Sequence, residues 1–224
     1  MNPHQFLLPL TLHPSFEMGD FIVSSSNEEA LSWLGKWPEW PSRTLLIYGS
    51  QGSGKSHLAS IWKSNARLLR PEEITVETLE VILTKSQNHF ILDNAEYVKD
   101  EEALFHFLNA TRQGDGSLLL LSQTPPREWG LTLPDLQSRL NALIAVGIQE
   151  PDDHLMRGLI KKYALDQQIP LSVDVLNYLF HHLPRSYQGL WASLEYINAE
   201  ALRKKRGITI PLVREALLEH TLII

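Results

Sequence analysis

The chain of 224 residues is long enough to bury a full hydrophobic core, in one domain or in one domain with a small appendage. It is 43% hydrophobic and 21% charged, as is typical of a globular protein, and the absence of cysteine excludes a disulfide framework and a cysteine-based metal site. A formal net charge of −6 and a pI of about 5.8 argue against a large sequence-independent DNA-binding surface.

The N-terminal stretch lacks the marks of a targeting signal. Its first ten residues have no basic region followed by a long apolar one, and no apolar run in the chain reaches membrane-spanning length. We therefore expect a cytoplasmic protein with no membrane partner. Three prolines punctuate residues 1–14, which we interpret as a tail carrying the apolar sequence QFLLPL. Such a tail either docks on its own domain or is captured as an extended peptide by a partner's groove.

A phosphate-binding loop dominates the first half of the chain. After a predicted helix at residues 28–34, the apolar run 45–48 predicts a strand, residues 49–56 spell GSQGSGKS, and a helical pattern follows from residue 54. Strand, GxxxxGKS loop and helix is the order of a P-loop. The glycines permit backbone angles that a Cβ would forbid, Lys55 can reach the β- and γ-phosphates, and the Ser56 hydroxyl can hold Mg²⁺. We assign nucleotide contacts to Gly49, Gly52, Ser53, Gly54, Lys55, Ser56 and His57.

Strands and helices alternate up to residue 150. Predicted strands at 67–69, 89–92, 117–121 and 143–148 are separated by predicted helices at 71–84 and 99–112. Alternation around a P-loop predicts a three-layer α/β domain with a parallel sheet. From residue 151 onward the pattern is helical only, with Ser172 and Ser186 as N-caps and a last helix opened by Ile210. We therefore expect a tail at 1–14, an α/β base at 15–150 and a four-helix lid at 151–224.

Polar residues at strand ends are the remaining candidates for chemistry. Asp93 ends the strand FILD and can hold Mg²⁺ or merely cap a turn. The next residue is Asn94, which cannot take a proton from an attacking water, and Glu96 does not have the usual spacing of a catalytic acid. Gln123, at the end of the strand SLLLLSQ, either orients water near the γ-phosphate or is a plain turn residue.

Two arginines have both a local and a catalytic interpretation. Arg139, in LPDLQSRL, either forms a local ion pair or projects into a neighbour's nucleotide as an arginine finger. Arg185, just before the long lid helix, either pairs locally or folds onto a bound phosphate.

The motifs together resemble the AAA+ family, and within it the group formed by the bacterial replication initiator DnaA and its regulator Hda. The resemblance covers nearly the whole chain and is carried by QFLLPL, DFIVSSSN, GSQGSGKS, ILDN, SQTPP and LPDLQSRL. The P-loop is generic, whereas the N-terminal hexapeptide together with LPDLQSRL is much more specific.

The resemblance implies roles for individual residues. The hexapeptide matches the family's motif for the sliding clamp of DNA polymerase III, through Gln5, Leu8, Pro9 and Leu10. The loop would bind ADP or ATP with Mg²⁺ held by Ser56 and Asp93, and Gln123 matches the sensor position of the fourth strand. Arg185 looks like the sensor arginine of the lid, and Arg139 like the arginine finger that acts in trans on ATP held by DnaA.

Two departures from the initiator bear on function. Asn94 replaces the second acid, so we expect weak or no intrinsic ATPase activity and a nucleotide-bound state, with ADP favoured. Residues 151–224 are taken by the lid, so we expect no helix-turn-helix domain and no direct sequence-specific DNA binding. The alternatives are a stand-alone AAA+ ATPase of helicase-loader type and a nucleotide-binding clamp adaptor without effect on hydrolysis. The sequence also allows a homo-oligomer.

Overall fold

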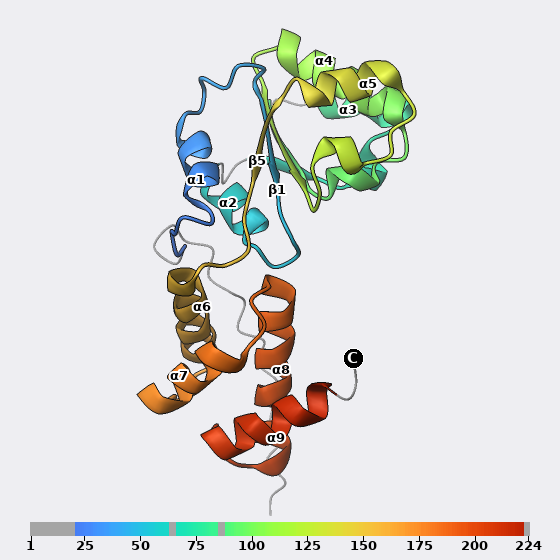
Figure 1. The fold of residues 1–224 in the computed structure, drawn as a ribbon. Helices are drawn as coiled ribbons and strands as arrows, with labels where there is room; N and C mark the ends of the chain where they lie inside the picture. The colour runs from blue at the N-terminus through green and yellow to red at the C-terminus, as the bar shows by residue number, and fades with distance from the viewer. Residues whose placement is uncertain (1–20, 63–65, 85–87, 222–224) are drawn as a thin grey trace, which may run out of the picture.

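The computed structural model describes residues 21–62, 66–84 and 88–221, and shows an α/β domain joined to a separate group of helices (Figure 1). The N-terminal tail expected at residues 1–14, with its proposed clamp-binding residues, lies outside the described residues. None of the helices in the described ranges combines the length and the apolar character that a membrane span requires.

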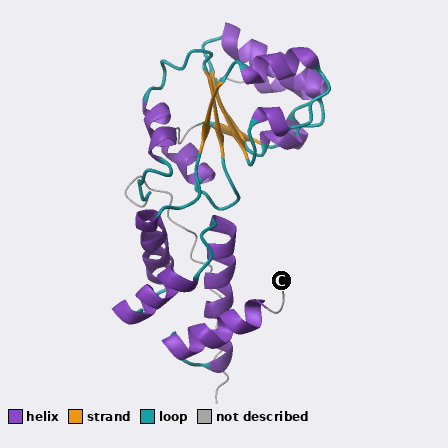
Figure 2. Ribbon diagram, viewed as in Figure 1, coloured by secondary structure: helices purple, strands orange, loops and turns teal. Residues whose placement is uncertain are grey.

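The sheet is parallel throughout, as the alternation of strands and helices predicted (Figure 2). Its strand order is β2-β3-β4-β1-β5, so the strand that leads into the phosphate loop lies between two neighbours. The five strands are β1 (Thr44–Tyr48), β2 (Arg67–Leu69), β3 (His89–Leu92), β4 (Ser117–Ser122) and β5 (Ile144–Gly147). All carboxyl ends therefore meet at one edge, where the phosphate loop also begins.

Helices cover both faces of the sheet. One face is covered by α1 (Glu28–Gly35) and α2 (Lys55–Trp62), and the other by α3 (Val76–Thr84), α4 (Glu101–Gln113) and α5 (Pro134–Asn141). Side chains of one strand alternate between the two layers: Leu46 belongs to the cluster under α3–α5, whereas Leu45 and Ile47 belong to the cluster under α1 and α2. Two buried faces explain why the interior positions of the central strands β1, β3 and β4 are apolar.

The helix predicted at residues 71–84 is interrupted in the structure. A short 3₁₀ turn at Pro71–Glu73 is followed by Ile74 in an extended conformation, and α3 begins only at Val76. The Thr78 hydroxyl donates to the Glu73 carbonyl at 2.5 Å and accepts from the Thr75 N–H at 3.2 Å. These local bonds satisfy backbone groups that a continuous helix would have used, because a threonine side chain competes with the helical ladder.

The four-helix lid is confirmed and has a hydrophobic core of its own. It consists of α6 (Asp153–Asp166), α7 (Val173–His182), α8 (Tyr187–Lys204) and α9 (Ile210–Thr221). The predicted caps Ser172 and Ser186 accept hydrogen bonds from Val175 N and Gly189 N, at 3.3 and 3.2 Å.

Hydroxyl groups ahead of α1 bind the start of the lid. Asp152 is the N-cap of α6, and its carboxylate accepts from Leu155 N at 2.7 Å and from Ser25 Oγ at 2.7 Å. Its own N–H donates to Ser26 Oγ at 3.0 Å, and Gln149 N donates to the Ser26 carbonyl at 2.9 Å. The backbone N–H of Leu155, assisted by the Ser25 hydroxyl, lowers the pKa of Asp152 to about 2. We call this group of bonds the serine junction.

Candidate nucleotide site

The predicted phosphate loop connects β1 to α2 and has the backbone that phosphate binding requires. Gly52 and Gly54 have φ angles of 82° and 94°, in the left-handed region where a Cβ is strained. Helix α2 begins at Lys55, so the N–H groups of its first turn are free to face an anion at the loop.

Lys55 is held inside this loop by the loop itself. Its side chain is buried, and Nζ donates to the carbonyls of Gly49 at 2.7 Å and Ser50 at 3.1 Å. Burial lowers the pKa of Lys55, while the negative charges of Asp93 and Glu96 partly restore it. A phosphate would offer this ammonium group a charged acceptor, which binds more strongly than a neutral carbonyl.

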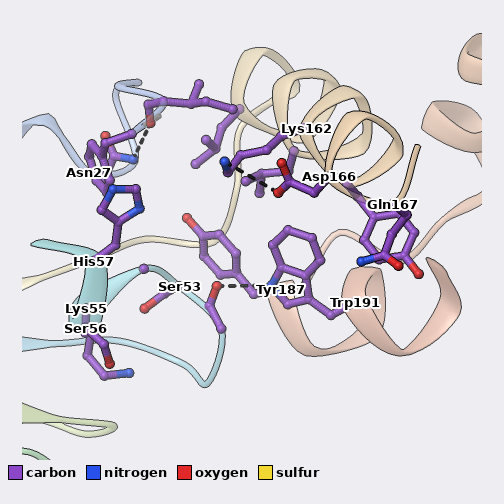
Figure 3. Close-up of a pocket in the computed structure, with 17 residues that line it drawn as sticks. Asn27, Ser53, Lys55, Ser56, His57, Lys162, Asp166, Gln167, Tyr187 and Trp191 are labelled. Atoms are coloured by element: carbon purple, nitrogen blue, oxygen red, sulfur yellow. Dashed lines mark hydrogen bonds and ion pairs between the residues drawn. The ribbon is translucent and has the colours of Figure 1, made fainter. Parts of the chain in front are cut away.

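A cavity of about 470 Å³ lies between the phosphate loop and the lid (Figure 3). Its volume is within the usual range of small-molecule sites. The chain segments that form its wall are the one ahead of α1, the loop with the start of α2, and helices α6 and α8 of the lid. Of the residues predicted to contact a nucleotide, those that line this cavity are Gly52, Ser53, Gly54, Lys55, Ser56 and His57.

Gly49 lies behind the loop and is close to its neighbours. A Cβ there would lie 3.0 Å from Ser53 Oγ and 3.1 Å from Ile148 Cβ. Gly49 therefore supports the loop through its backbone, by accepting from Lys55 and by donating its N–H to the Ser122 carbonyl at 3.2 Å.

Aromatic residues that the sequence analysis missed form the other side of the cavity. Phe21 packs edge-on against His57, with ring centroids 5.2 Å apart. On α8, Tyr187 and Trp191 lie one helical turn apart and both line the cavity, and Trp191 Nε1 donates to the Gly52 carbonyl at 3.1 Å. Their i, i+4 spacing is the one signal in the sequence, and it does not distinguish a core face from a ligand-binding face.

Residues at the carboxyl ends of β3 and β4 gather beside the loop. Asn94 has a φ of 54°, and the turn η3 (Ala95–Tyr97) that follows brings the Glu96 carboxylate back to the sheet edge. Glu96 Oε1 accepts from the Gln123 N–H at 2.8 Å, while Oε2 is buried with no hydrogen-bond partner among the described residues. Its sequence spacing argued against Glu96, but the structure places it next to the predicted sensor residue.

The predicted Mg²⁺ ligands fit an ion shared with a nucleotide. In the described ranges there is no cluster of three or more histidine or acidic side chains that could hold a metal by itself. Ser56 lines the cavity, and Asp93 lies within electrostatic reach of Lys55. Mg²⁺ is usually bound by one or two protein oxygens together with substrate phosphates and waters.

The two predicted arginines lie outside the cavity. Arg139, half-buried on α5, lines a separate groove formed with α3 and α4. Arg185 forms an ion pair with Asp153 at the start of α6, and its guanidinium lies 4.7 Å from the centre of the Phe180 ring. The structure therefore does not bring Arg185 to the phosphate loop, and its sensor role stays a prediction.

The parallel sheet, the phosphate loop at its edge and the four-helix lid over that loop form the fold of AAA+ proteins. The fold is similar to that of domain III of DnaA from Thermotoga maritima, with a TM-score of 0.75, 17% identity, and coverage of 93% of this chain and 98% of that one. AMPPCP-bound DnaA from Aquifex aeolicus has a TM-score of 0.66 at 21% identity, over 86% and 68% of the two chains. The RuvB Holliday junction branch migration motor of T. maritima has a TM-score of 0.69 at 18% identity, over 92% and 72%.

Sequence comparison shows which proteins of this fold the chain resembles. Residues 152–217 match the family model described as Hda, lid domain. The initiator protein DnaA of Symbiobacterium thermophilum is 26% identical over 236 residues, which cover 92% of this chain and 51% of that protein. DnaA of Caldanaerobacter subterraneus is 25% identical, over 96% and 55%. The chain is therefore similar to Hda in its lid and to DnaA over nearly its whole length, and it spans about half the length of the curated relatives it matches.

Proposed function

We propose that this DnaA-related regulator of replication initiation promotes hydrolysis of ATP bound to DnaA while its N-terminal tail holds the sliding clamp. The match of the lid to the Hda model and the similarity of the whole chain to DnaA support a partner of this kind. The clamp contact is assigned to Gln5, Leu8, Pro9 and Leu10, whose glutamine and leucine side chains suit an apolar groove.

The protein's own cavity would bind ADP or ATP. The loop would surround the phosphates with backbone N–H groups, and Lys55 would exchange its two carbonyl partners for phosphate oxygens. Ser56 and Asp93 would hold Mg²⁺, which supplies positive charge to the phosphates when it is bound. Related DnaA structures with bound AMPPCP support a nucleotide at this place in the fold.

The observation that carries the proposal is the position of Arg139. Arg139 lies on α5 and does not line the cavity at the phosphate loop of its own molecule. None of the ion pairs found among the described residues involves it. A half-buried guanidinium so placed can reach a triphosphate held by a second molecule. There it would stabilise charge on the transferring phosphoryl group.

The decisive measurement is ATP hydrolysis by DnaA with this protein and a DNA-loaded clamp. The Arg139→Ala variant should lose stimulation by about 10³-fold or more, the range known for arginine fingers. Arg127→Ala is the matched control, because the Arg127 side chain is 78% exposed and its one ion pair within the described ranges is with adjacent Glu128 at 3.6 Å. Stimulation by Arg139→Ala at the wild-type level would remove this residue from the mechanism. A tail with Leu8→Ala and Leu10→Ala should lose clamp binding while the folded body stays intact.

A stand-alone ATPase is the second candidate, favoured by one observation. Beside Gln123, Glu96 has a buried carboxylate oxygen to which no described residue donates a hydrogen bond, and its charge acts on Lys55. A carboxylate in this place could accept a proton from an attacking water in the role that Asn94 cannot fill. Rapid ATP turnover by the purified chain without DnaA would favour this candidate.

A further inference from the structure

Tyr187 has a buried hydroxyl group that nothing in the described parts of the chain satisfies. The residue is 1% exposed, and its Oη has no hydrogen-bond partner among the described residues. Buried side-chain hydroxyls in native proteins nearly always have a partner, from the protein, from water or from a ligand. An unsatisfied one therefore needs an explanation.

The position of this hydroxyl points to a ligand. Tyr187 lines the cavity between the phosphate loop and the lid, and in Figure 3 its ring extends from α8 across that cavity. A second buried hydroxyl that finds no partner within the described ranges is that of Ser53, a phosphate-loop residue that lines the same cavity. One unsatisfied hydroxyl therefore comes from the lid and one from the loop.

The neighbouring residue of α8 fixes the lid on the loop. Trp191, one turn after Tyr187, donates its indole N–H to the Gly52 carbonyl at 3.1 Å. A Cβ built on Gly52 would lie only 2.6 Å from Trp191 Cδ1, so the indole lies directly on the loop backbone. This contact sets the distance between the Tyr187 ring and the phosphate loop.

Cations of the lid do not occupy this position. Arg185 is paired with Asp153 on the outer side of the lid, and Lys162, which does line the cavity, is paired with Asp166 at 3.5 Å. Among the described residues, the polar contribution of α8 to the cavity therefore consists of neutral donors.

We propose that the Tyr187 hydroxyl is the lid's nucleotide-binding group, donating a hydrogen bond to an oxygen of the bound nucleoside diphosphate or triphosphate, with Trp191 positioning it over the loop. The inference rests on the proposed function, in that the cavity binds a nucleotide. Burial and the nearby charges of Glu150 and Asp152 raise the pKa of Tyr187 above its usual value, so the hydroxyl keeps its proton at neutral pH. A neutral donor contributes similarly to the binding free energies of ADP and ATP, because its hydrogen bond depends little on the additional negative charge of the third phosphate.

The test is calorimetric titration of the full chain with MgADP and with Mg-AMPPCP. Tyr187→Phe removes one oxygen atom and keeps the ring. We expect Kd to rise about 3- to 10-fold for both nucleotides, the value of one neutral hydrogen bond. The thermal midpoint of the nucleotide-free protein should stay the same or rise, because the variant no longer buries an unsatisfied hydroxyl. Tyr196→Phe is the matched control on the same helix, since the Tyr196 hydroxyl lies 3.4 Å from Glu219, away from the cavity, and its Kd should equal that of the wild type.

The outcomes separate this inference from the proposal on which it rests. If the wild type binds, Lys55→Ala does not, and Tyr187→Phe binds as tightly as the wild type, the hydroxyl has no role and only this inference is overturned. A Tyr187→Phe variant with a much lower midpoint before nucleotide is added would also overturn it, by showing a structural role. If the wild type binds neither nucleotide, the nucleotide site itself is wrong and the inference falls with it.

Discussion

Replacing Gly52 with alanine tests the contact between the lid and the phosphate loop. Gly52 has a φ of 82°, and a Cβ at this position would lie 2.6 Å from Trp191 Cδ1 and 2.7 Å from Trp191 Nε1. Carbon atoms do not approach so closely, so either the loop or the indole must move. Movement of the indole breaks its hydrogen bond to the Gly52 carbonyl.

The expected cost has two parts. A left-handed φ costs a residue with a Cβ about 1–2 kcal/mol, and the lost hydrogen bond adds about 1 kcal/mol. Gly52→Ala should therefore lower the free energy of unfolding by about 2–3 kcal/mol. Gly130 is the matched control: its φ is 67°, and a Cβ there meets nothing within 4 Å. Gly130→Ala should show the backbone part alone, about 1–2 kcal/mol.

The assay is urea unfolding of both variants, each also combined with Trp191→Ala. Without the indole, the additional cost of Gly52→Ala should disappear, so the two glycine variants should become equally stable. Equal losses for Gly52→Ala and Gly130→Ala in the presence of Trp191 would refute the reasoning, because the contact would then have no energetic weight.

Three further results are expected. Glu96→Gln removes a proton acceptor and keeps the shape of the side chain. It should therefore abolish any ATP turnover by the chain alone but leave the affinity for MgADP within about 3-fold. Unchanged turnover would exclude Glu96 as the base. Asp152→Ala should lower the free energy of unfolding by about 1 kcal/mol at neutral pH through loss of the α6 cap. In pH-dependent unfolding, the difference in unfolding free energy between the wild type and Asp152→Ala should persist above about pH 4 and vanish as the pH falls through about 2. The reason is that a carboxylate whose pKa is depressed in the folded state stops stabilising that state once it is protonated. A difference that does not change with pH would contradict the role of Asp152 as the cap. Calorimetry of Arg185→Ala with MgADP tests the sensor role: a loss of affinity of about 100-fold is expected if the arginine reaches the nucleotide. A Kd within about 2-fold of the wild type would show that its role is limited to the exposed ion pair with Asp153.

Local patterns predicted most of the fold. Strands buried on both faces have apolar interior positions, as residues 118–121 of β4 show. The order of strand, glycine-rich loop and helix placed β1 and α2 correctly. Capping residues located the lid helices, because a serine side chain satisfies the first free N–H groups of a helix wherever the helix packs. The interruption between residues 71 and 84 was missed, since it depends on which acceptors Thr78 chooses.

Of the residues that line the cavity, only those of the phosphate loop could be predicted from the sequence. Gly52 and Trp191 are 139 positions apart, and nothing in the sequence says that this face of α8 packs on the loop. The sensor role of Arg185 stays a prediction that rests on its resemblance to a family motif, and the ion pair with Asp153 was not predictable because the two residues are far apart in the sequence. The position of Glu96 beside Gln123 was not predictable, because the left-handed Asn94 turns the chain back, which spacing along the sequence does not reveal.

The serine junction has a consequence for how nucleotide enters and leaves. Its hydroxyl bonds can be exchanged for bonds to water one at a time, each at a net cost of about 1 kcal/mol, so the joint itself offers little resistance to rotation of the lid. Resistance comes instead from Leu155 and Tyr187, the lid residues fully buried in the hydrophobic cluster of the sheet domain, and from the contact of Trp191 with Gly52. Substitutions at these side chains are therefore expected to change the residence time of the nucleotide.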